Sequence, residues 1–487
     1  GKFIHGLSEL KERAVEYPVE RVAEITGVPA EDITEAARFF ANAKRASIHW
    51  GVPIDMCPDG TSVAHGIICL WAITGNIDIP GGQVIARPSH EVSSYPYSTE
   101  ALVDLYGEEL VKTLTEKRIG ADAYKMVKNF RGWAQPDMVI DQIMTGEPYP
   151  IKGAWIQTAN VLGGQAARAN FHYEALKKLE FVAVVDLFYN PTIMALADIV
   201  LPSSTFPEKD SFRSWWAPLS IIKKRVQVGD CKTDWEINFE LAKRFNPEGT
   251  QRWGSPMEYF NERLAPSGKT FKDMEEAGGW LMPEDGPAKP YRRHERGLLR
   301  QDGEPGFNTR TGKIEVYCTA YEDWDLDPLP FYTEPPQSPI STPELHEKYP
   351  LIMITGARSQ LFFHSEHRGI PWLREKEPDP YVEVHPETAA DYDVYDGEWI
   401  YLKNDLGKVK RKVMITKRVK PTEIQTLHGW WMPEQEGAEP NLFGVWDYQI
   451  NQLVPGPQES QSGFGGGQYK TTLVTLEKIN EGAQANG

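Results

Sequence analysis

The sequence YPLIMITGAR, residues 349–358, joins an apolar run to an abrupt polar turn. Residues 351–354 have the composition of a buried β-strand, and the turn that follows contains Thr355, Gly356 and Arg358. A strand that ends in such a turn presents backbone N–H groups, a hydroxyl and a guanidinium to an anion. The stretch therefore predicts a site for a phosphate-bearing ligand at the tip of a strand.

Short strand-like segments continue from this turn towards the C-terminus. Residues 380–384, 398–404 and 409–415 are separated by the turns Asp396-Gly397 and 405–408. Short strands joined by Asp-Gly-type turns are typical of a small closed β-barrel, in which closure removes the exposed edges. The sequence predicts such a barrel for the domain that spans residues 331–487.

Residues 151–330 show a different pattern, in which strands and helices alternate. Strand-like segments at 153–158, 181–186 and 198–202 are separated by helical segments at 171–179 and 191–197. This order predicts a doubly wound α/β domain, which binds nucleotides at the carboxyl edge of its strands. Asn160 and Asp186 lie at two of these strand tips, although Asp186 has a helix-capping role as its alternative interpretation.

Residues 1–150 are predicted to form a partial α/β domain. A Gly-rich turn at 75–82 is followed by Arg87, His90 and Glu91, a combination suited to substrate binding or proton transfer. A solvated loop is the alternative. We also expect a buried strand at 46–50, and further along the chain a surface insertion at 246–306 and a hairpin at 307–316.

The order of several motifs resembles the molybdopterin oxidoreductases, the dimethyl sulfoxide reductase family. The shared motifs are Tyr349-Pro-Leu, Thr355-Gly, His364-Ser365, Pro378-Asp-Pro380, His385-Pro386, Asp396-Gly397 and His428-Gly-Trp-Trp, together with Thr158-Ala-Asn160, Val185-Asp186 and Ala197-Asp198-Ile-Val-Leu-Pro202. That family binds molybdenum or tungsten between two pterin guanine dinucleotides. The resemblance implies doubly wound α/β domains followed by a C-terminal β-barrel of the double-psi type. It also implies that the loop after residues 75–82, in the domain at 1–150, lines a substrate funnel.

The resemblance also implies which residues bind the cofactor. Asp186 would accept the N1 and N2 donors of a guanine, and Asn160 would face pyrophosphate or ribose. The other implied cofactor-binding residues are Thr192, Pro202, Thr355, Gly356, Arg358, His364, Ser365, His428, Asn451, Gln468 and Lys470. Arg87 and His90 are the candidate catalytic residues, and no residue is assigned as a metal ligand.

Net charge, cysteine spacing and the absence of several motifs argue against other classes of protein. The net charge of −17 disfavours nucleic acid, and no apolar run approaches the length of a membrane span. The four cysteines stand too far apart for a C-x-x-C motif, and Cys57 is interpreted as a plain loop thiol near the pocket. Ser267-Gly-Lys-Thr270 is no P-loop because Arg263 replaces the first glycine. The absence of G-x-S-x-G and H-E-x-x-H removes support for hydrolases and metalloproteases.

The resemblance leaves three functions open. The motifs at 147–150, 329–332, 377–380 and 433–436 are similar to the acetylene hydratase and catechol dehydroxylase group. The first hypothesis is a two-electron oxidoreductase acting on a small substrate, the second a non-redox hydratase or transhydroxylase, and the third a non-catalytic cofactor-binding piece. Residues 1–27 match a family segment that follows the iron-sulfur motif, so we expect the cluster in a preceding part of the enzyme and an iron-sulfur electron-transfer subunit as a candidate partner.

Overall fold

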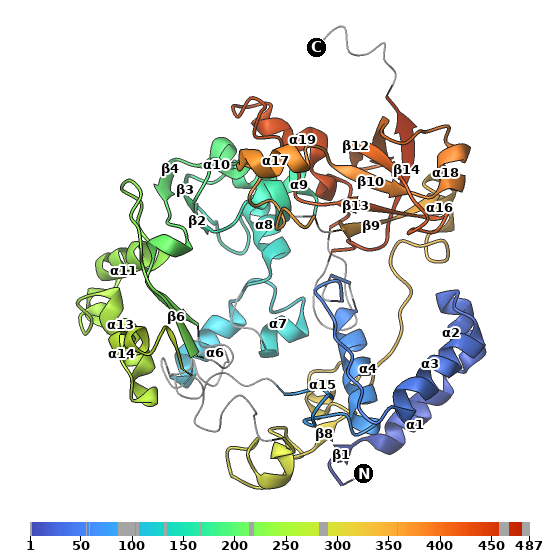
Figure 1. Ribbon diagram of the computed structural model, residues 1–487, viewed down its shortest axis with the longest axis horizontal. Helices are drawn as coiled ribbons and strands as arrows, with labels where there is room; N and C mark the ends of the chain where they lie inside the picture. Colours follow the sequence, from blue (N-terminus) through green and yellow to red (C-terminus); the bar gives the residue numbers. More distant parts are fainter. Residues whose placement is uncertain are drawn as a thin grey trace.

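The computed structural model of the 487-residue chain describes residues 2–54, 56–57, 59–85, 103, 107–130, 134–165, 167–213, 219–281, 291–357, 359–456 and 467–479. Its described elements gather into four groups: N-terminal helices, a parallel sheet with helices, a small antiparallel sheet with helices, and a C-terminal barrel (Figure 1). The parallel sheet and the barrel are neighbours in space. This arrangement places the two ligand-binding regions expected from the sequence side by side.

The parallel sheet contains β2 (Gly153–Gln157), β3 (Phe181–Asp186) and β4 (Ile199–Pro202), with β3 in the centre. The apolar residues 182–185 of β3 are all buried, as a central parallel strand requires. Helices α8 (Pro136–Thr145), α9 (Ala169–Leu176) and α10 (Pro191–Leu196) accompany the sheet. The α/β fold expected here is confirmed, and residues 136–208 are called the α/β lobe.

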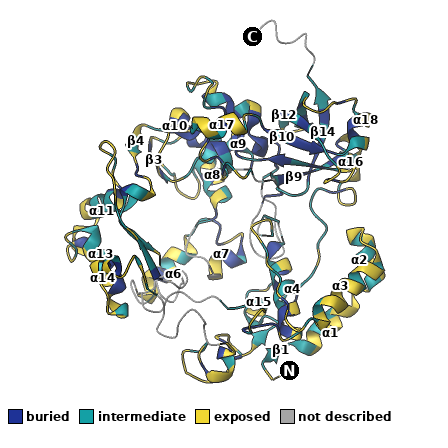
Figure 2. Ribbon diagram, viewed as in Figure 1, coloured by how far each residue is buried: buried dark blue, intermediate teal, exposed yellow. Residues whose placement is uncertain are grey.

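Six C-terminal strands close into a barrel in the order β10-β12-β11-β14-β9-β13. Along β11 buried and half-buried residues alternate, so Ile400 and Leu402 point into the core. The barrel strands carry both dark blue and teal segments in Figure 2, as this alternation of buried and half-buried residues requires. The expected closed barrel is confirmed and is called the barrel lobe. Its strands are β9 (Leu351–Ala357), β10 (Tyr381–Val384), β11 (Trp399–Asn404), β12 (Gly407–Ile415), β13 (Glu423–Leu427) and β14 (Thr472–Lys478).

Short helices complete the barrel lobe. They are α16 (Pro343–Lys348), α17 (Pro371–Lys376), α18 (Pro386–Asp391), α19 (Val445–Tyr448) and the 3₁₀ turns η5 (Leu442–Gly444) and η6 (Ile450–Gln452). Leu442 and Val445 pack in one apolar cluster with Leu162, Leu176 and Val184 of the α/β lobe. Burial of apolar surface therefore holds the two lobes together.

The N-terminal group consists of β1 (Ile4–His5) and helices α1 (Leu7–Val15), α2 (Val19–Thr26), α3 (Ala30–Asn42) and α4 (Gly60–Ile73). β1 pairs in parallel with β8 (Ile314–Glu315), which is followed by α15 (Thr319–Asp323). The expected hairpin at 307–316 is therefore wrong, because its second half pairs with the N-terminus. The expected strand at 46–50 is also wrong: Ile48 and Trp50 pack in the N-terminal core without strand pairing.

A second, antiparallel sheet is formed by β5 (Ser211–Arg213), β6 (Leu219–Ile222) and β7 (Trp280–Leu281). It packs with α11 (Asp234–Phe245), α12 (Pro247–Thr250), α13 (Pro256–Leu264) and α14 (Phe271–Glu276). Phe260, Leu264, Phe271 and Met274 are buried in this body. The surface insertion expected at 246–306 is therefore wrong for residues 256–281, which build a core of their own.

Further described helices are α6 (Glu108–Glu116), α7 (Lys125–Phe130), the π-helical turn η1 (Val161–Gln165) and the 3₁₀ turns η2 (Phe206–Glu208), η3 (Ala265–Ser267) and η4 (Arg293–Arg296). The division of the chain at residues 150 and 330 stays a prediction. In the N-terminal core, Cys69 and Trp71 pack with Phe307 and Val316. Residues that precede the α/β lobe in the sequence thus share one core with residues that follow it.

Candidate functional site

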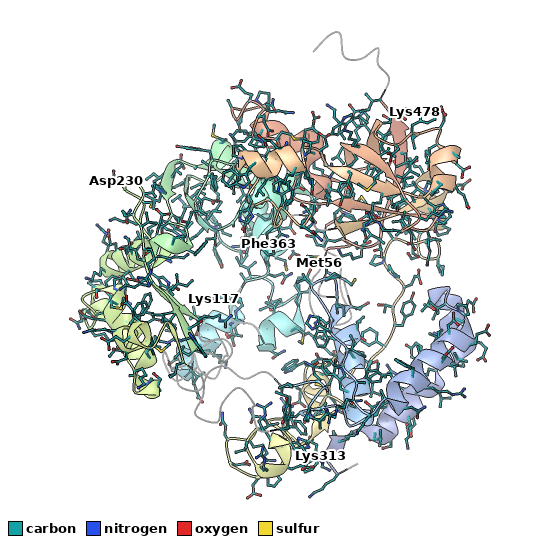
Figure 3. The ribbon with its side chains drawn as sticks, viewed as in Figure 1. Met56, Lys117, Asp230, Lys313, Phe363 and Lys478 are labelled. Carbon is teal, nitrogen blue, oxygen red and sulfur yellow. The ribbon has the colours of Figure 1, made fainter. Side chains whose placement is uncertain are left out.

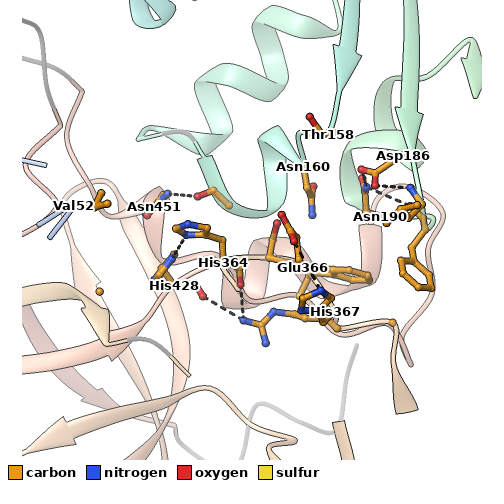
Figure 4. A pocket seen from close by; sticks show the side chains of 18 of the residues that line it. Val52, Thr158, Asn160, Asp186, Asn190, His364, Glu366, His367, His428 and Asn451 are labelled. Carbon is orange, nitrogen blue, oxygen red and sulfur yellow. Dashed lines mark hydrogen bonds and ion pairs between the residues drawn. The ribbon is translucent and has the colours of Figure 1, made fainter. Parts of the chain in front are cut away.

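A cavity of about 470 Å³ lies between the α/β lobe and the barrel lobe. Asn160 and Asp186 line it from the first lobe, and Thr355 and Lys470 line it from the second. Val52, Pro53 and Met56 contribute from an N-terminal loop, and Figure 3 shows Met56 near the centre of the molecule. The residues expected at two separate strand tips therefore face one common space (Figure 4).

Asn160 is oriented by its neighbours in the α/β lobe. Its Oδ1 accepts hydrogen bonds from Thr192 Oγ1 at 2.8 Å and from the Gly163 N–H at 3.1 Å. Because the Gly163 N–H can only donate, the amide oxygen must face it and Nδ2 is the remaining end. That Nδ2 atom is buried and has no hydrogen-bond partner among the described residues. Asn160 thus presents a bare donor at the cavity wall.

Asp186 sits at the carboxyl end of β3. Its two oxygens accept from the Leu187 N–H at 2.7 Å and from Asn190 Nδ2 at 2.8 Å. Asn190, and not Asp186, caps α10, so the capping alternative for Asp186 is wrong. Burial raises the pKa of the Asp186 carboxyl, and the nearby charge of Glu366 raises it further. Each carboxylate oxygen keeps a lone pair for a ligand donor.

The chain after β4 adds a polar end to the cavity. Asp234 Oδ1 accepts from Ser203 Oγ at 3.1 Å and from Gln157 Nε2 at 2.9 Å, and Lys209 Nζ lies 3.6 Å from Asp234 Oδ2. Ser204 Oγ is buried without a partner among the described residues. This end of the cavity therefore offers a cation, a carboxylate and a free hydroxyl.

The barrel lobe contributes the turn after β9. Thr355 Oγ1 donates to the Tyr469 carbonyl at 2.8 Å, and Lys470 Nζ donates to the Thr355 carbonyl. Gly356 has φ of 133°, and a Cβ there would collide with the Lys470 ammonium. The glycine thus allows the lysine to lie across the turn, where it brings positive charge to the cavity wall.

Two histidines face each other on the same wall. His364 Nδ1 and His428 Nε2 are 2.7 Å apart (Figure 4). Arg368, 1% exposed, holds both loops by donating to the carbonyls of Gly429 at 2.6 Å, His364 at 3.2 Å and His428 at 3.3 Å. Its guanidinium stacks on Trp430, and burial lowers its pKa well below the usual value. The arginine fixes the backbone that carries the imidazole pair.

Cys57 lies next to this cavity in surroundings that favour the thiol over the thiolate. Its Sγ donates to the Pro53 carbonyl at 3.5 Å. Burial raises the pKa of the thiol, while the charge of Lys470 opposes that shift. Because the thiolate is the reactive form, these surroundings favour the interpretation of Cys57 as a loop thiol.

Most of the residues expected from the sequence come together here. The cavity is lined by Asn160, Asp186, Thr355, Gly356, His364, Ser365, His428, Asn451 and Lys470. Thr192 lies beneath it, and Pro202 pairs with Asp186 in the sheet. Gln468, which precedes the lining residues Tyr469 and Lys470, is buried but does not itself line the cavity. Arg87, His90 and Arg358 lie outside the described residues.

Sequence reasoning missed several lining residues, namely Ser203, Ser204, Lys209, Asp234, Glu366, His367 and Arg368. Asp234 follows the helix cap Thr233 and has the appearance of an ordinary first-turn acid. Lys209 precedes the first strand of the antiparallel sheet and has no local signature. Only the spacing His364-x-x-His367-Arg368 could have indicated that this whole turn faces a ligand.

Metal ligands are not evident in the described part of the chain, where no three His, Cys, Asp or Glu side chains gather closely enough to hold an ion. Among the described helices, none combines the length and the apolar character needed to cross a bilayer. The cavity instead offers bare polar atoms, Asn160 Nδ2, Ser204 Oγ and Asn451 Oδ1, together with two lysines. These are the features of a protein that holds an elongated polar ligand between two lobes.

Comparison with known proteins agrees with this arrangement. Residues 35–244 match the molybdopterin oxidoreductase family, and residues 351–471 match the molydopterin dinucleotide binding domain. The chain is 31% identical to acetylene hydratase of Syntrophotalea acetylenica over 90% of its length, and 28% identical to dopamine dehydroxylase of Eggerthella lenta over 91%. The solved structure of acetylene hydratase from Pelobacter acetylenicus superimposes with a TM-score of 0.85 at 27% identity, covering 98% of this chain and 67% of that one.

The chain belongs to the molybdopterin oxidoreductase family. It spans 61% of the length of the Syntrophotalea acetylene hydratase and 50% of that of the dopamine dehydroxylase. The family resemblance identified from the motifs is confirmed, and so is the expectation of a molybdopterin cofactor.

Proposed function

We propose that this chain is the part of a molybdenum- or tungsten-dependent enzyme that binds the two pterin guanine dinucleotides of its cofactor. The observation that carries the proposal is the single cavity between two lobes, with Asp186 on one wall and Thr355 and Lys470 on the other. Buried polar atoms without partners line it, and such atoms are costly unless a ligand satisfies them. The residues present therefore fit a large polar cofactor.

Each wall would hold a different part of that cofactor. Asp186 would accept the N1 and N2 donors of guanine, and Asn160 would donate to pyrophosphate or ribose. Phosphate and pterin groups would lie against Thr355, Gly356, His364, Ser365, His428, Asn451 and Lys470. When bound, the metal and its dithiolenes would supply two-electron chemistry or activate a small substrate.

The charge of the barrel wall supports an anionic ligand in a chain whose net charge is −17. Lys470 lies across the β9 turn, and Lys209 contributes from the far end. Arg368 is buried with carbonyl partners, and no carboxylate lies within ion-pair distance of it in the described part of the chain. Positive charge on a cavity wall attracts phosphate oxygens, and a low dielectric strengthens the attraction.

The reaction itself is proposed as a two-electron oxidation or reduction of a small substrate, with Arg87 and His90 at the substrate side. The similarity to acetylene hydratase favours a non-redox hydration or transhydroxylation as the second candidate. Turnover coupled to a reduced viologen dye would separate them: dye oxidation that depends on added substrate supports the redox reaction, and product formation without dye oxidation supports the hydratase.

The proposal of cofactor binding is tested by analysis of the purified protein. Stoichiometric molybdenum or tungsten, together with pterin fluorescence after oxidation and release of guanine nucleotide, is the expected result. Protein without metal, pterin or guanine would favour a non-catalytic scaffold. We further propose that the iron-sulfur cluster and the metal ligand come from a preceding part of the same enzyme, and that an iron-sulfur subunit exchanges electrons with it.

A further inference from the structure

Two asparagines, one on each lobe, each present to the cavity a polar atom that has no hydrogen-bond partner among the described residues. One of these atoms is a donor and the other is an acceptor. Asn160 has its Nδ2 donor free, as its oxygen is engaged by Thr192 and Gly163. Asn451 has the opposite polarity, because its Nδ2 donates to the Gly164 carbonyl at 3.3 Å and its Oδ1 has no partner in the described part of the chain. A carbonyl only accepts, so the amide orientation of Asn451 is fixed.

Both asparagines are tied to one unusual turn. Residues Val161–Gln165 form a π-helical turn, a rare conformation that is frequent at functional sites. The turn follows directly on Asn160, and a Cβ on Gly163 would collide with the Asn160 amide. A Cβ on Gly164 would lie 3.1 Å from Ser365 Oγ of the barrel lobe. The turn is therefore packed tightly against both the asparagine and the opposite lobe.

One fully buried side chain links this turn to Asn451. Gln449 is 0% exposed, and its Nε2 donates to the Leu162 carbonyl at 2.9 Å across 287 positions of sequence. Its Oε1 accepts from the Asn451 N–H at 3.3 Å and so caps the η6 turn. Gln449 does not line the cavity, yet it contacts the backbone of both segments that present the bare atoms.

We propose that Gln449 is a positioning residue that fixes the Asn160 donor and the Asn451 acceptor at one separation, so that a single ligand is held by both lobes. The ligand that fits has both an acceptor oxygen and an N–H or O–H donor, as a phosphate group and a hydroxyl or amine provide. The inference deepens the proposed function and rests on it for the identity of the ligand. The link itself rests only on the contacts of Gln449.

The test compares two substitutions at Gln449 with a matched control. Gln449→Met keeps the length of the side chain and Gln449→Leu keeps much of its apolar volume, and neither can donate to the Leu162 carbonyl or accept from the Asn451 N–H. Gln452→Leu is the control, because Gln452 is also buried and bonds only to carbonyls of its own segment, those of Trp446 and Gln449. Gln449→Asn, which shortens the side chain by one methylene, replaces any Gln449 variant that fails to fold.

GDP serves as the probe, with its dissociation constant measured by calorimetry and amide exchange measured at residues 160–165. Loss of an oriented hydrogen bond to a charged ligand predicts at least about tenfold weaker GDP binding for both Gln449 variants. Exchange at 160–165 should be faster without ligand in those variants and unchanged in Gln452→Leu. The control should lower the unfolding midpoint but keep GDP affinity within about twofold of the unaltered protein.

Two results would overturn the inference: GDP binding by the Gln449 variants at wild-type strength, or equal weakening by Gln452→Leu. If the unaltered protein does not bind GDP, the proposed nucleotide ligand fails separately. Amide exchange then decides the link by itself. Faster exchange at 160–165 only in the Gln449 variants supports the positioning role, and equal exchange in all variants refutes it.

Discussion

Replacement of Asp186 by asparagine tests the nucleotide end of the cavity. The carboxylate already accepts from Leu187 and Asn190, and each oxygen retains a lone pair for one guanine donor. In Asp186→Asn, the oxygen must stay with the Leu187 N–H, so the new NH₂ group faces the Asn190 amide. Asn190 cannot turn away, because its own oxygen caps α10 at Thr192 and Ile193.

The expected loss follows from these bonds. A hydrogen bond to a charged acceptor contributes about 1.5–3 kcal/mol, and the variant loses one of them and weakens the other. A total of about 2–4 kcal/mol corresponds to GDP binding that is roughly 30- to 1,000-fold weaker. The matched control is Asp198→Asn, because Asp198 also accepts from a strand N–H, that of Val182, but does not line the cavity.

The assay that isolates the base compares GDP with inosine diphosphate, which lacks the 2-amino donor. The unaltered protein should prefer GDP by about tenfold or more, and Asp186→Asn should reduce that preference. A preference that is the same in both proteins would refute the contact between Asp186 and guanine, whatever the change in overall affinity. Asp198→Asn should keep both the affinity and the preference.

The pH dependence gives a second check with a defined sign. Burial raises the pKa of Asp186 above 3.8, so acidification protonates it earlier in the folded protein than in the unfolded chain. Between 3.8 and the raised pKa the folded state holds more protons, and lowering the pH therefore increases the free energy of unfolding from this group. GDP binding should weaken over the same window, and the difference between the unaltered protein and Asp186→Asn should shrink.

Three further substitutions test other parts of the structure. Arg368→Ala leaves three buried carbonyls without their charged donor, and should lower the free energy of unfolding in urea by about 3–5 kcal/mol; a loss below about 1 kcal/mol would contradict the assigned contacts. Asp78→Asn removes the counter-ion of the fully buried Arg293, 2.7 Å away, and should cost about 3–5 kcal/mol, most of which Asp78→Asn combined with Arg293→Met recovers; equal instability of the two would argue against a buried-charge effect. His172 has a pKa lowered from 6.5 to about 4, chiefly by burial, so the unfolded chain holds more protons between these values and stability falls as the pH drops from 6.5 to 4. His172→Leu should remove about 3 kcal/mol of that acid sensitivity in unfolding curves recorded across this range, and an unchanged slope would show that His172 is not its source.

Local sequence patterns predicted the parts of the site that lie at strand tips. The apolar run before Asp186 requires a buried strand, and the acid that ends it must then appear at the edge of the sheet. The run before Thr355 works in the same way. The sequence could thus place these residues on two walls, and the structure places both walls around one cavity.

Residues whose partners are distant in sequence could not be found in this way. Gln449 bonds to Leu162 across 287 positions, and nothing near residue 449 indicates that contact. The apolar segment at 46–50 has the composition of a strand, but it packs in the N-terminal core without one. Composition shows that such segments are buried, whereas tertiary packing decides whether strand or loop buries them.

The pairing of β1 with β8 places a constraint on synthesis. Ile4 pairs with Ile314, so the N-terminal core lacks its last strand until about 310 further residues have been translated. At ordinary elongation rates this is a delay of about 15–60 s. Throughout that interval the apolar surface around Trp71 lacks its packing partners Phe307 and Val316, and transiently exposed apolar surface of this kind promotes aggregation.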